Sequence, residues 1–156
     1  TSRARYLLLD WIARHIDQAE RAELWLPADE YPETWLADLQ PKLESPSRAP
    51  MGRVLDVAKI GGMQVGEGHF TAQVTDPICP WNQGVWRFEA ANHKLLVTRS
   101  ENAVFDLTIQ GLSGLAAGTL DPQDLLLRGW GNPGAAQQTI LRAMFPRKAP
   151  YLHEVF

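Results

Sequence analysis

Residues 85–99 read VWRFEAANHKLLVTR, and this stretch decides the fold class. Apolar residues alternate with charged ones in its first half: Trp86, Phe88 and Ala90 with Arg87 and Glu89. This period of two is typical of a strand with one face on the core and the other in water. A second apolar run follows at 94–99, after a short link with Asn92, which tolerates left-handed backbone. The stretch therefore predicts an antiparallel hairpin of residues 85–90 and 94–99.

The alternating pattern recurs on both sides of this hairpin. It predicts further strands over 53–57, 70–75 and 105–109. Beyond Gln110 the spacing becomes helical, and it predicts helices over 112–116, 121–127 and 132–144. Because Asp or Asn followed by Pro commonly starts a helix, we expect the last two to be capped at Asp121 and Asn132. Strands followed by helices predict an α+β fold, with a mainly antiparallel sheet and helices packed on one face.

The first 44 residues read as a separate piece. Apolar spacing predicts an amphipathic helix over 4–18, then a short strand at 22–27 and a brief helix at 31–36. About 40 residues are too few to close a core. We therefore interpret 1–44 as a fragment of a larger preceding domain or as a cover on the next one. The Pro-rich stretch 45–50 is the predicted linker, and 51–156 is the predicted second domain.

Composition excludes several classes of function. The net charge is −3, and no run of Lys or Arg interrupts that balance, so nucleic acid is not an expected partner. The longest apolar runs, such as 6–9, are far shorter than the ~20 residues that span a bilayer, and the start lacks a signal-peptide pattern. We therefore expect a cytoplasmic protein without membrane contact. The chain begins at Thr1 rather than Met, which indicates processing or a longer precursor.

Few side chains are candidates for catalysis. The single cysteine, Cys79, has prolines on both sides and no basic residue nearby in sequence, which favours a buried thiol over a nucleophile. In the same loop, we expect Asp76 and Asn82 to form turns by bonding neighbouring backbone N–H groups. His69 and His93 are expected to be solvated or hydrogen-bonded, and the glycines of 61–68 lack a phosphate-binding pattern. No metal site is predicted.

The last eight residues, APYLHEVF at 149–156, form the most unusual segment. Chain ends are usually polar and frayed. Here four residues supply apolar surface, and Phe156 also carries the α-carboxylate. Two interpretations stay open: the segment packs on its own sheet, or its apolar residues dock a carboxylate against a neighbouring domain.

A series of motifs in fixed order connects these segments. It comprises Met51–Val57, Val74–Pro77, Pro80–Gly84 with Trp86, Asp106–Ile109 with Leu112, Leu115 and Gly118, and Pro150-Tyr151 with Phe156. Over residues 50–156 this order resembles the sterol-carrier-protein-like C-terminal domain of the enhanced intracellular survival family of GNAT-type N-acetyltransferases. Upstream, 6–15 and 24–29 resemble the closing helix and strand of that family's second GNAT-like domain. One departure is Ile60-Gly61-Gly62, where the family more often begins a helix.

The resemblance implies a role within a larger enzyme. Members of the family acetylate amines, including those of aminoglycosides and lysine side chains, and their first domain binds acetyl-CoA. Their terminal carboxylate is the general base, a role that falls on the α-carboxylate of Phe156 in this sequence. The chain by itself is then expected to lack a cofactor site and to be inactive. Its implied partners are the N-terminal GNAT domains of the same polypeptide and further copies in a homo-oligomer.

Two other classes of function remain alternatives. Residues 51–156 could be a stand-alone sterol-carrier-like module that binds a lipid or another apolar ligand, a reading suggested by the fold resemblance and the tryptophan and leucine content. They could also serve only as an oligomerisation domain. Fold analogy alone does not choose among these.

Overall fold

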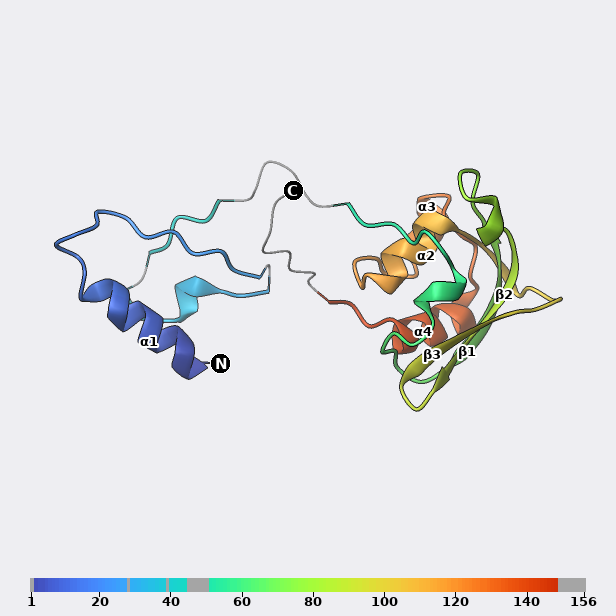
Figure 1. Ribbon diagram of the computed structural model, residues 1–156, viewed down its shortest axis with the longest axis horizontal. Coiled ribbons are helices and arrows are strands. Elements are labelled where there is room, and N and C mark those ends of the chain that lie inside the picture. Colours follow the sequence, from blue (N-terminus) through green and yellow to red (C-terminus); the bar gives the residue numbers. More distant parts are fainter. Residues whose placement is uncertain (1, 28, 39, 45–50, 149–156) are drawn as a thin grey trace.

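The computed structural model of the chain describes residues 2–27, 29–38, 40–44 and 51–148. The N-terminal segment, residues 2–44, contains helix α1 (Ser2–Ala13) and the 3-10 helix η1 (Pro32–Thr34) (Figure 1). The domain from residue 51 onward contains these elements: η2 (Ala58–Ile60), β1 (His69–Thr75), η3 (Pro80–Asn82), β2 (Gly84–Ala91), β3 (Lys94–Arg99), β4 (Phe105–Thr108), α2 (Ile109–Ala116), α3 (Asp124–Leu127) and α4 (Ala135–Met144). The predicted linker at 45–50 lies outside the described residues. None of the described helices is long and apolar enough to cross a membrane.

The four strands form one sheet in the order β3-β2-β1-β4. The two neighbouring pairs β1–β2 and β2–β3 are antiparallel, whereas β1 and β4 run parallel, with Val74 beside Leu107. Parallel neighbours need a long crossover, and residues 76–104, which include the β2–β3 hairpin, provide it. The predicted α+β fold with a mainly antiparallel sheet is confirmed.

The hairpin forms as the sequence predicts. Phe88 of β2 lies opposite Val97 of β3, and Ala91 lies opposite Lys94, so only Asn92 and His93 form the loop. Both have positive φ, 51° and 60°, as the central residues of a type I′ turn require. The twist of such a turn matches the twist of the paired strands, which fixes the register.

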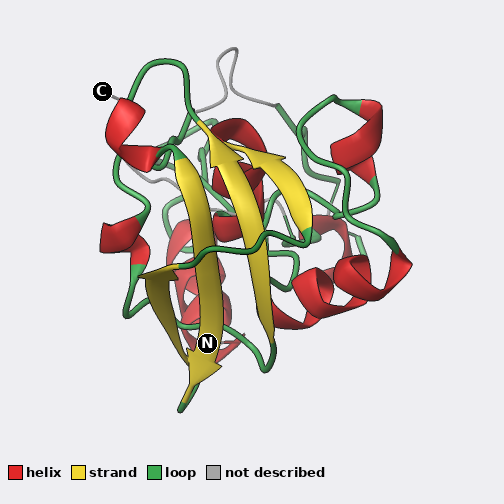
Figure 2. Cartoon of the chain, turned by 90° about the vertical axis from the view of Figure 1, so that its right-hand side faces the viewer, coloured by secondary structure: helices red, strands yellow, loops and turns green. Residues whose placement is uncertain are grey.

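Helices α2, α3 and α4 pack on one face of the sheet (Figures 1 and 2). Alternate strand residues such as Phe70, Ala72 and Val74 are buried on that face. An aromatic cluster fills the centre: Phe70 stacks on Phe88 with ring centroids 4.6 Å apart, and Phe105 and Phe145 lie 5.8 and 6.2 Å from Phe70. The packed interior sits between the sheet and the helices, as the sequence pattern implies.

The expected strand at 53–57 is wrong. The backbone N–H of Val57 donates to Asn82 Oδ1 at 2.9 Å, and the carbonyl of Leu55 accepts from the Asn82 amide at 3.1 Å. Val54 N–H donates to the hydroxyl of Ser113 at 3.0 Å. Because side chains take these backbone groups, the segment crosses the domain without joining the sheet. A short 3-10 helix, η2, follows at the position where the departure from the family pattern was noted.

Neither predicted cap, at Asp121 or Asn132, starts its helix: α3 begins after Gln123, which makes no side-chain cap bond. Thr108 caps α2, since its Oγ1 accepts from Gly111 N–H at 3.3 Å, and Asp121 Oδ1 accepts from Gln123 N–H at 3.0 Å just before α3. Asn132 does not cap α4, which begins after Gly134. The Asn132 side chain instead accepts from Asp106 N–H at 2.6 Å and donates to the Asp106 carboxylate at 3.1 Å. Asp106 lies in the edge strand β4, and its N–H and carboxylate bond the Asn132 side chain in place of the N–H groups at the start of α4.

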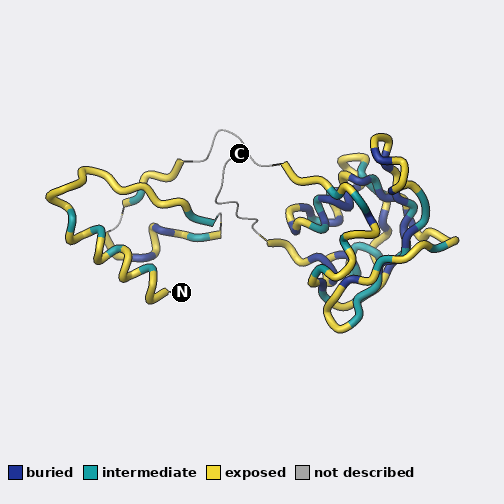
Figure 3. Tube along the Cα trace, in the orientation of Figure 1, coloured by how far each residue is buried: buried dark blue, intermediate teal, exposed yellow. Residues whose placement is uncertain are grey.

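The N-terminal segment buries little of its apolar surface. Helix α1 ends at Ala13, earlier than the predicted residue 18, and none of its residues is buried. Residues 22–27 form no strand, because the described sheet holds β1–β4 alone. Trp35, just after η1, is buried against this segment, while most of the segment's trace is exposed (Figure 3). Among the described residues of this segment, most apolar side chains are thus not covered by the second layer that a closed domain would provide.

Candidate functional site

The predicted site residue, Phe156, lies with the rest of 149–156 outside the described residues. The structure describes the path of the chain up to Lys148. Helix α4 ends at Met144, and the next residue, Phe145, is buried in the aromatic cluster. Lys148 N–H then donates to the carbonyl of Gly118 at 2.9 Å, in the loop that follows α2. The segment that leads to the predicted site is therefore held on the body of the domain.

The start of the domain is held on the same helix. Val54 N–H bonds Ser113 Oγ, which in turn donates to the carbonyl of Ile109 at 2.6 Å within α2. Ser113 lies within α2, and Gly118 follows two residues after the helix ends at Ala116. The chain thus enters and leaves this domain along α2. This arrangement links the predicted linker to the predicted catalytic segment through one rigid element.

The loop 76–83 contains a buried polar network. Asp76 is fully buried, and its Oδ1 accepts from the N–H groups of Ile78 and Cys79, each at 3.0 Å. Its Oδ2 accepts from the Asn82 amide at 2.9 Å, and Arg53 Nη2 donates to Oδ1 at 2.5 Å. The expectation that Asp76 forms a turn is confirmed by its bonds from the Ile78 and Cys79 N–H groups. The same expectation for Asn82 is wrong, because its side chain bonds Val57, Leu55 and Asp76 instead of neighbouring backbone N–H groups. Sequence reasoning missed Arg53 as a partner, because it lies 23 positions away in a segment expected to be a strand.

Electrostatics in this loop favour the ionised carboxylate. Burial by itself would raise the pKa of Asp76, but hydrogen bonds from Asn82, the Cys79 N–H, Arg53 and the Ile78 N–H outweigh it and hold that pKa well below its usual range. The hydrogen bond that Arg53 donates to Asp76, opposed by partial burial, in turn raises the pKa of Arg53. A carboxylate held this firmly as an anion is a poor proton acceptor at neutral pH. The network therefore has a structural role: it holds residues 53–57 against the loop 76–83.

The other candidate side chains are not brought together. Cys79 is buried, as the sequence predicts. His93 Nδ1 lies 3.3 Å from Glu67 Oε1 at the surface, and His69 opens β1. Within the ranges that the structure describes, no group of three His, Cys, Asp or Glu side chains is arranged to hold a metal ion.

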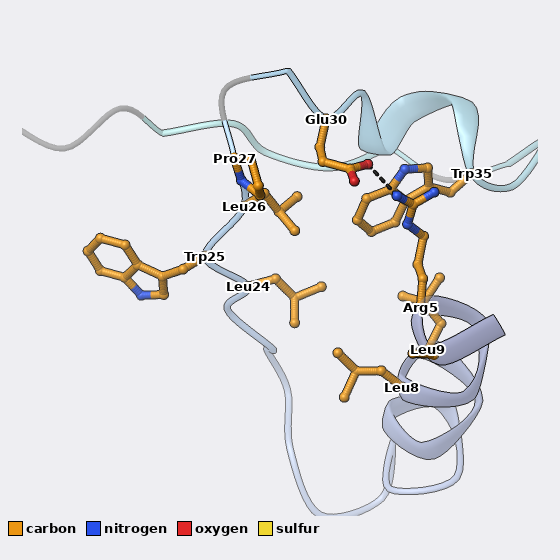
Figure 4. Close-up of a pocket in the computed structure, with 10 residues that line it drawn as sticks. Arg5, Leu8, Leu9, Leu24, Trp25, Leu26, Pro27, Glu30 and Trp35 are labelled. Carbon is orange, nitrogen blue, oxygen red and sulfur yellow. Dashed lines mark hydrogen bonds and ion pairs between the residues drawn. The ribbon is translucent and has the colours of Figure 1, made fainter. Parts of the chain in front are cut away.

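Among the shallow hollows on the part of the surface that the structure describes, two have a defined lining. The first, of about 310 Å³, is on the N-terminal segment, where leucines of α1 face Leu24 and Leu26, and Arg5 lies over the Trp35 ring at 4.4 Å and pairs with Glu30 (Figure 4). The second, of about 240 Å³, lies where the parallel strands β1 and β4 end, beside Asp106 and Asn132. Neither is lined by the aromatic core. The space between sheet and helices, where a lipid tunnel would have to run, is occupied by the buried side chains of that core.

The fold and this path of the chain define the class of protein. A mixed four-stranded sheet with helices on one face is a sterol-carrier-like α+β domain. The family model of the sterol carrier protein domain matches residues 57–153, more than half of the chain, and the chain belongs to that family. No protein of curated function matches the sequence.

Solved structures with a similar fold include two proteins that are N-acetyltransferases by name. A GCN5-related N-acetyltransferase from Anabaena variabilis is 25% identical with a TM-score of 0.56, and one from Kribbella flavida is 26% identical with a TM-score of 0.55. Eis1 from Mycobacterium abscessus, 16% identical with a TM-score of 0.52, shares the fold. The similarity covers 63–64% of this chain but only 26% of each of those chains. The chain thus spans about a quarter of their length and has an acetyltransferase-related fold.

Proposed function

We propose that this chain is the C-terminal part of an acetyl-CoA-dependent N-acetyltransferase of the enhanced intracellular survival type. The proposal rests chiefly on the match to the sterol carrier protein domain together with the fold similarity to GCN5-related N-acetyltransferases, of which the matched part of this chain covers 26%. The acceptor is an amine of the aminoglycoside or lysine type, as the sequence resemblance implies. The exposed apolar surface of residues 2–44 supports the further proposal that this segment completes a preceding GNAT-like domain.

We assign the general base to the α-carboxylate of Phe156, on the premise that Phe156 ends the natural polypeptide. An attacking amine is largely protonated at neutral pH and must lose a proton to attack the thioester, so a carboxylate within hydrogen-bond reach assists the reaction. A free α-carboxyl has a pKa of ~3.5, which makes it a weak base. Desolvation among apolar neighbours raises such a pKa. Leu152, Val155 and Phe156 itself provide those neighbours in the sequence.

The hydrogen bond between Lys148 and Gly118 limits how far this carboxylate can reach from the domain. Eight residues follow Lys148, and at ~3.3–3.6 Å per extended residue they reach at most about 26–29 Å. The acceptor site must therefore lie within this radius of the C-terminal end of α2. This limit is consistent with a site on an adjacent domain of the same polypeptide or of a neighbouring copy.

We place the acetyl-CoA site in the preceding domains, outside this chain. Pyrophosphate is commonly bound by free N–H groups at the start of a helix that follows a strand. In this domain α2 follows β4 directly, but Thr108 Oγ1 takes the Gly111 N–H, and Thr108 N–H donates to the carbonyl of Trp130 at 2.8 Å. The described residues therefore do not fit the cofactor there, and this chain contributes scaffold and base.

The test uses the full-length protein with one residue added after Phe156 and, separately, with Phe156 deleted. Loss of a positioned general base lowers kcat by ~10²–10⁴-fold. The matched control inserts one residue into the exposed loop 101–103, which lengthens the chain without touching its end. Acetyl-CoA affinity should be unchanged in all three variants. Normal turnover in both end variants overturns the proposal.

A second candidate function is the binding of a lipid or other apolar ligand, and the family match to the sterol carrier protein domain favours it. Because side chains fill the interior, an apolar ligand would have to bind in a surface hollow or require the core to rearrange. Saturable uptake of a fluorescent fatty acid by the 156-residue chain would support it. The absence of both uptake and co-purified lipid would count against it.

A further inference from the structure

The loop after α2 holds the end of the described chain at two points. Lys148 N–H donates to the carbonyl of Gly118, and the guanidinium of Arg142 in α4 pairs with Asp121 through contacts of 2.7 and 3.2 Å. We propose that Gly118 is a positioning residue for the C-terminal segment: it seats residues 146–148 and so fixes the origin from which 149–156 extends. The catalytic meaning of this seat rests on the proposed function.

Gly118 meets two separate requirements. Its φ of +70° ends α2, a conformation that side-chain-bearing residues rarely adopt, and its N–H donates to the carbonyl of Leu115 at 2.9 Å. A Cβ at this position would also lie 3.0 Å from Lys148 N and 3.1 Å from the carbonyl oxygen of Pro146. Any side chain would therefore require the departing backbone to shift by a few tenths of an ångström away from the helix end, which would lengthen and weaken the Lys148 hydrogen bond.

The contact between Arg142 and Asp121 holds the same loop from the other side. Asp121 also accepts the N–H of Gln123 at 3.0 Å, so its carboxylate is fixed by its own loop before α4 engages it. Phe145, between Arg142 and Pro146, is buried against Phe70. With the chain fixed on both sides of Phe145, the direction in which Lys148 leaves the domain is set by the α2 loop.

Gly129 provides a matched control for the conformational cost. It follows α3 as Gly118 follows α2, with a φ of +66°, and its N–H donates to the carbonyl of Leu126 at 3.1 Å. No atom lies within 4 Å of the position that its Cβ would take. Gly129→Ala therefore carries the backbone strain of a left-handed alanine without touching the departing chain, whereas Gly118→Ala carries both effects.

The first experiment measures hydrogen exchange of individual amides by NMR in the 156-residue chain. We expect Gly118→Ala to accelerate exchange of the Lys148 amide at least tenfold relative to β1 amides, while Gly129→Ala leaves it within twofold. Gly118→Asn is the second variant, because Asn tolerates positive φ better than Ala but still carries a Cβ, so it separates the contact from misfolding. Unchanged Lys148 exchange in both Gly118 variants overturns the inference.

The second experiment compares turnover in the full-length protein. Gly118→Ala should lower kcat at least tenfold with unchanged KM for acetyl-CoA, and Gly129→Ala should keep kcat within twofold. Accelerated Lys148 exchange with unchanged kcat overturns the positioning role alone. A variant extended beyond Phe156 that turns over normally overturns the proposed function instead, so the two failures are distinguishable.

Discussion

Replacing Asp76 with Asn is the sharpest test of the buried network. Asn keeps the oxygen that accepts from Ile78 and Cys79 N–H, but it puts an NH₂ group where Oδ2 now accepts from Asn82. Rotating the Asn82 amide does not repair this clash, since Asn82 would then lose its bonds to Val57 N–H and the Leu55 carbonyl. One charge-assisted hydrogen bond is lost, at about 1.5–3 kcal/mol, and a buried donor is left unsatisfied, at about 1–3 kcal/mol. We expect the free energy of unfolding to fall by about 3–5 kcal/mol.

Urea unfolding of the 156-residue chain, followed by tryptophan fluorescence, measures this loss. Asp56→Asn is the control, because the partly exposed Asp56 accepts one N–H, from Ala58, through an oxygen that Asn retains. Its effect should stay below about 0.5 kcal/mol. A loss below 1 kcal/mol for Asp76→Asn refutes the reasoning.

The same prediction has a pH dependence. The folded-state pKa of Asp76 lies below its unfolded value, so the ionised carboxylate stabilises the fold at pH values above the unfolded pKa of about 3.9. That contribution is lost progressively as the pH falls from about 4 toward the lower folded-state pKa. The difference in stability between the wild type and Asp76→Asn should therefore be constant from pH 5 to 7 and shrink below pH 4. A difference that stays constant down to pH 2.5 contradicts the assignment.

Three further predictions concern the core, the hairpin and assembly. Phe88→Ala removes a fully buried ring stacked on Phe70 and should lower the free energy of unfolding by about 3–5 kcal/mol in urea, and a loss under 1 kcal/mol would contradict the packing described. His93→Gly creates an Asn-Gly type I′ turn at a φ of 60° and should raise stability by up to about 1 kcal/mol, seen as a higher midpoint of thermal unfolding; a lower midpoint would argue against the turn. The full-length protein should sediment as a homo-oligomer, and a monomer at every concentration would contradict this.

Sequence patterning located the elements whose order depends on local chemistry. The hairpin, strands β1 and β4, and helices α2 to α4 all follow from alternation, helical spacing and glycine or proline signals. The expected strand at 53–57 shows where such patterning stops. Its alternation is real, but its backbone groups are taken by Asn82, 25 positions away, and by Ser113, 59 positions away. Alternation of apolar and polar residues cannot show whether the backbone groups of a segment will bond a neighbouring strand or side chains from elsewhere in the chain.

The sequence indicates one part of the candidate site, Phe156, but not the residue that positions it. Composition and motif spacing directed attention to Phe156 only through a family resemblance and an unusual apolar ending. They gave no indication that Gly118 holds the departing chain, because Gly118 and Lys148 are 30 positions apart and a glycine after a helix is fully explained as a cap. The only signal for a second role is three-dimensional, namely the close approach of Lys148 and Pro146 to the position of an absent Cβ.

Helix α2 joins these separate observations physically. Five of its eight residues are buried: Ile109, Gly111, Leu112, Ser113 and Leu115. It therefore cannot shift without disturbing the core, and interiors packed at such density transmit displacement rather than absorb it. Because Val54 is bonded to Ser113 and Lys148 is bonded to Gly118, the start of the domain and the last described residues before the C-terminal segment are expected to move together. If the preceding domain is positioned through residues 51–54, the same helix sets where the predicted base begins its reach. Variants that loosen α2 should consequently impair turnover even when they lie far from Phe156.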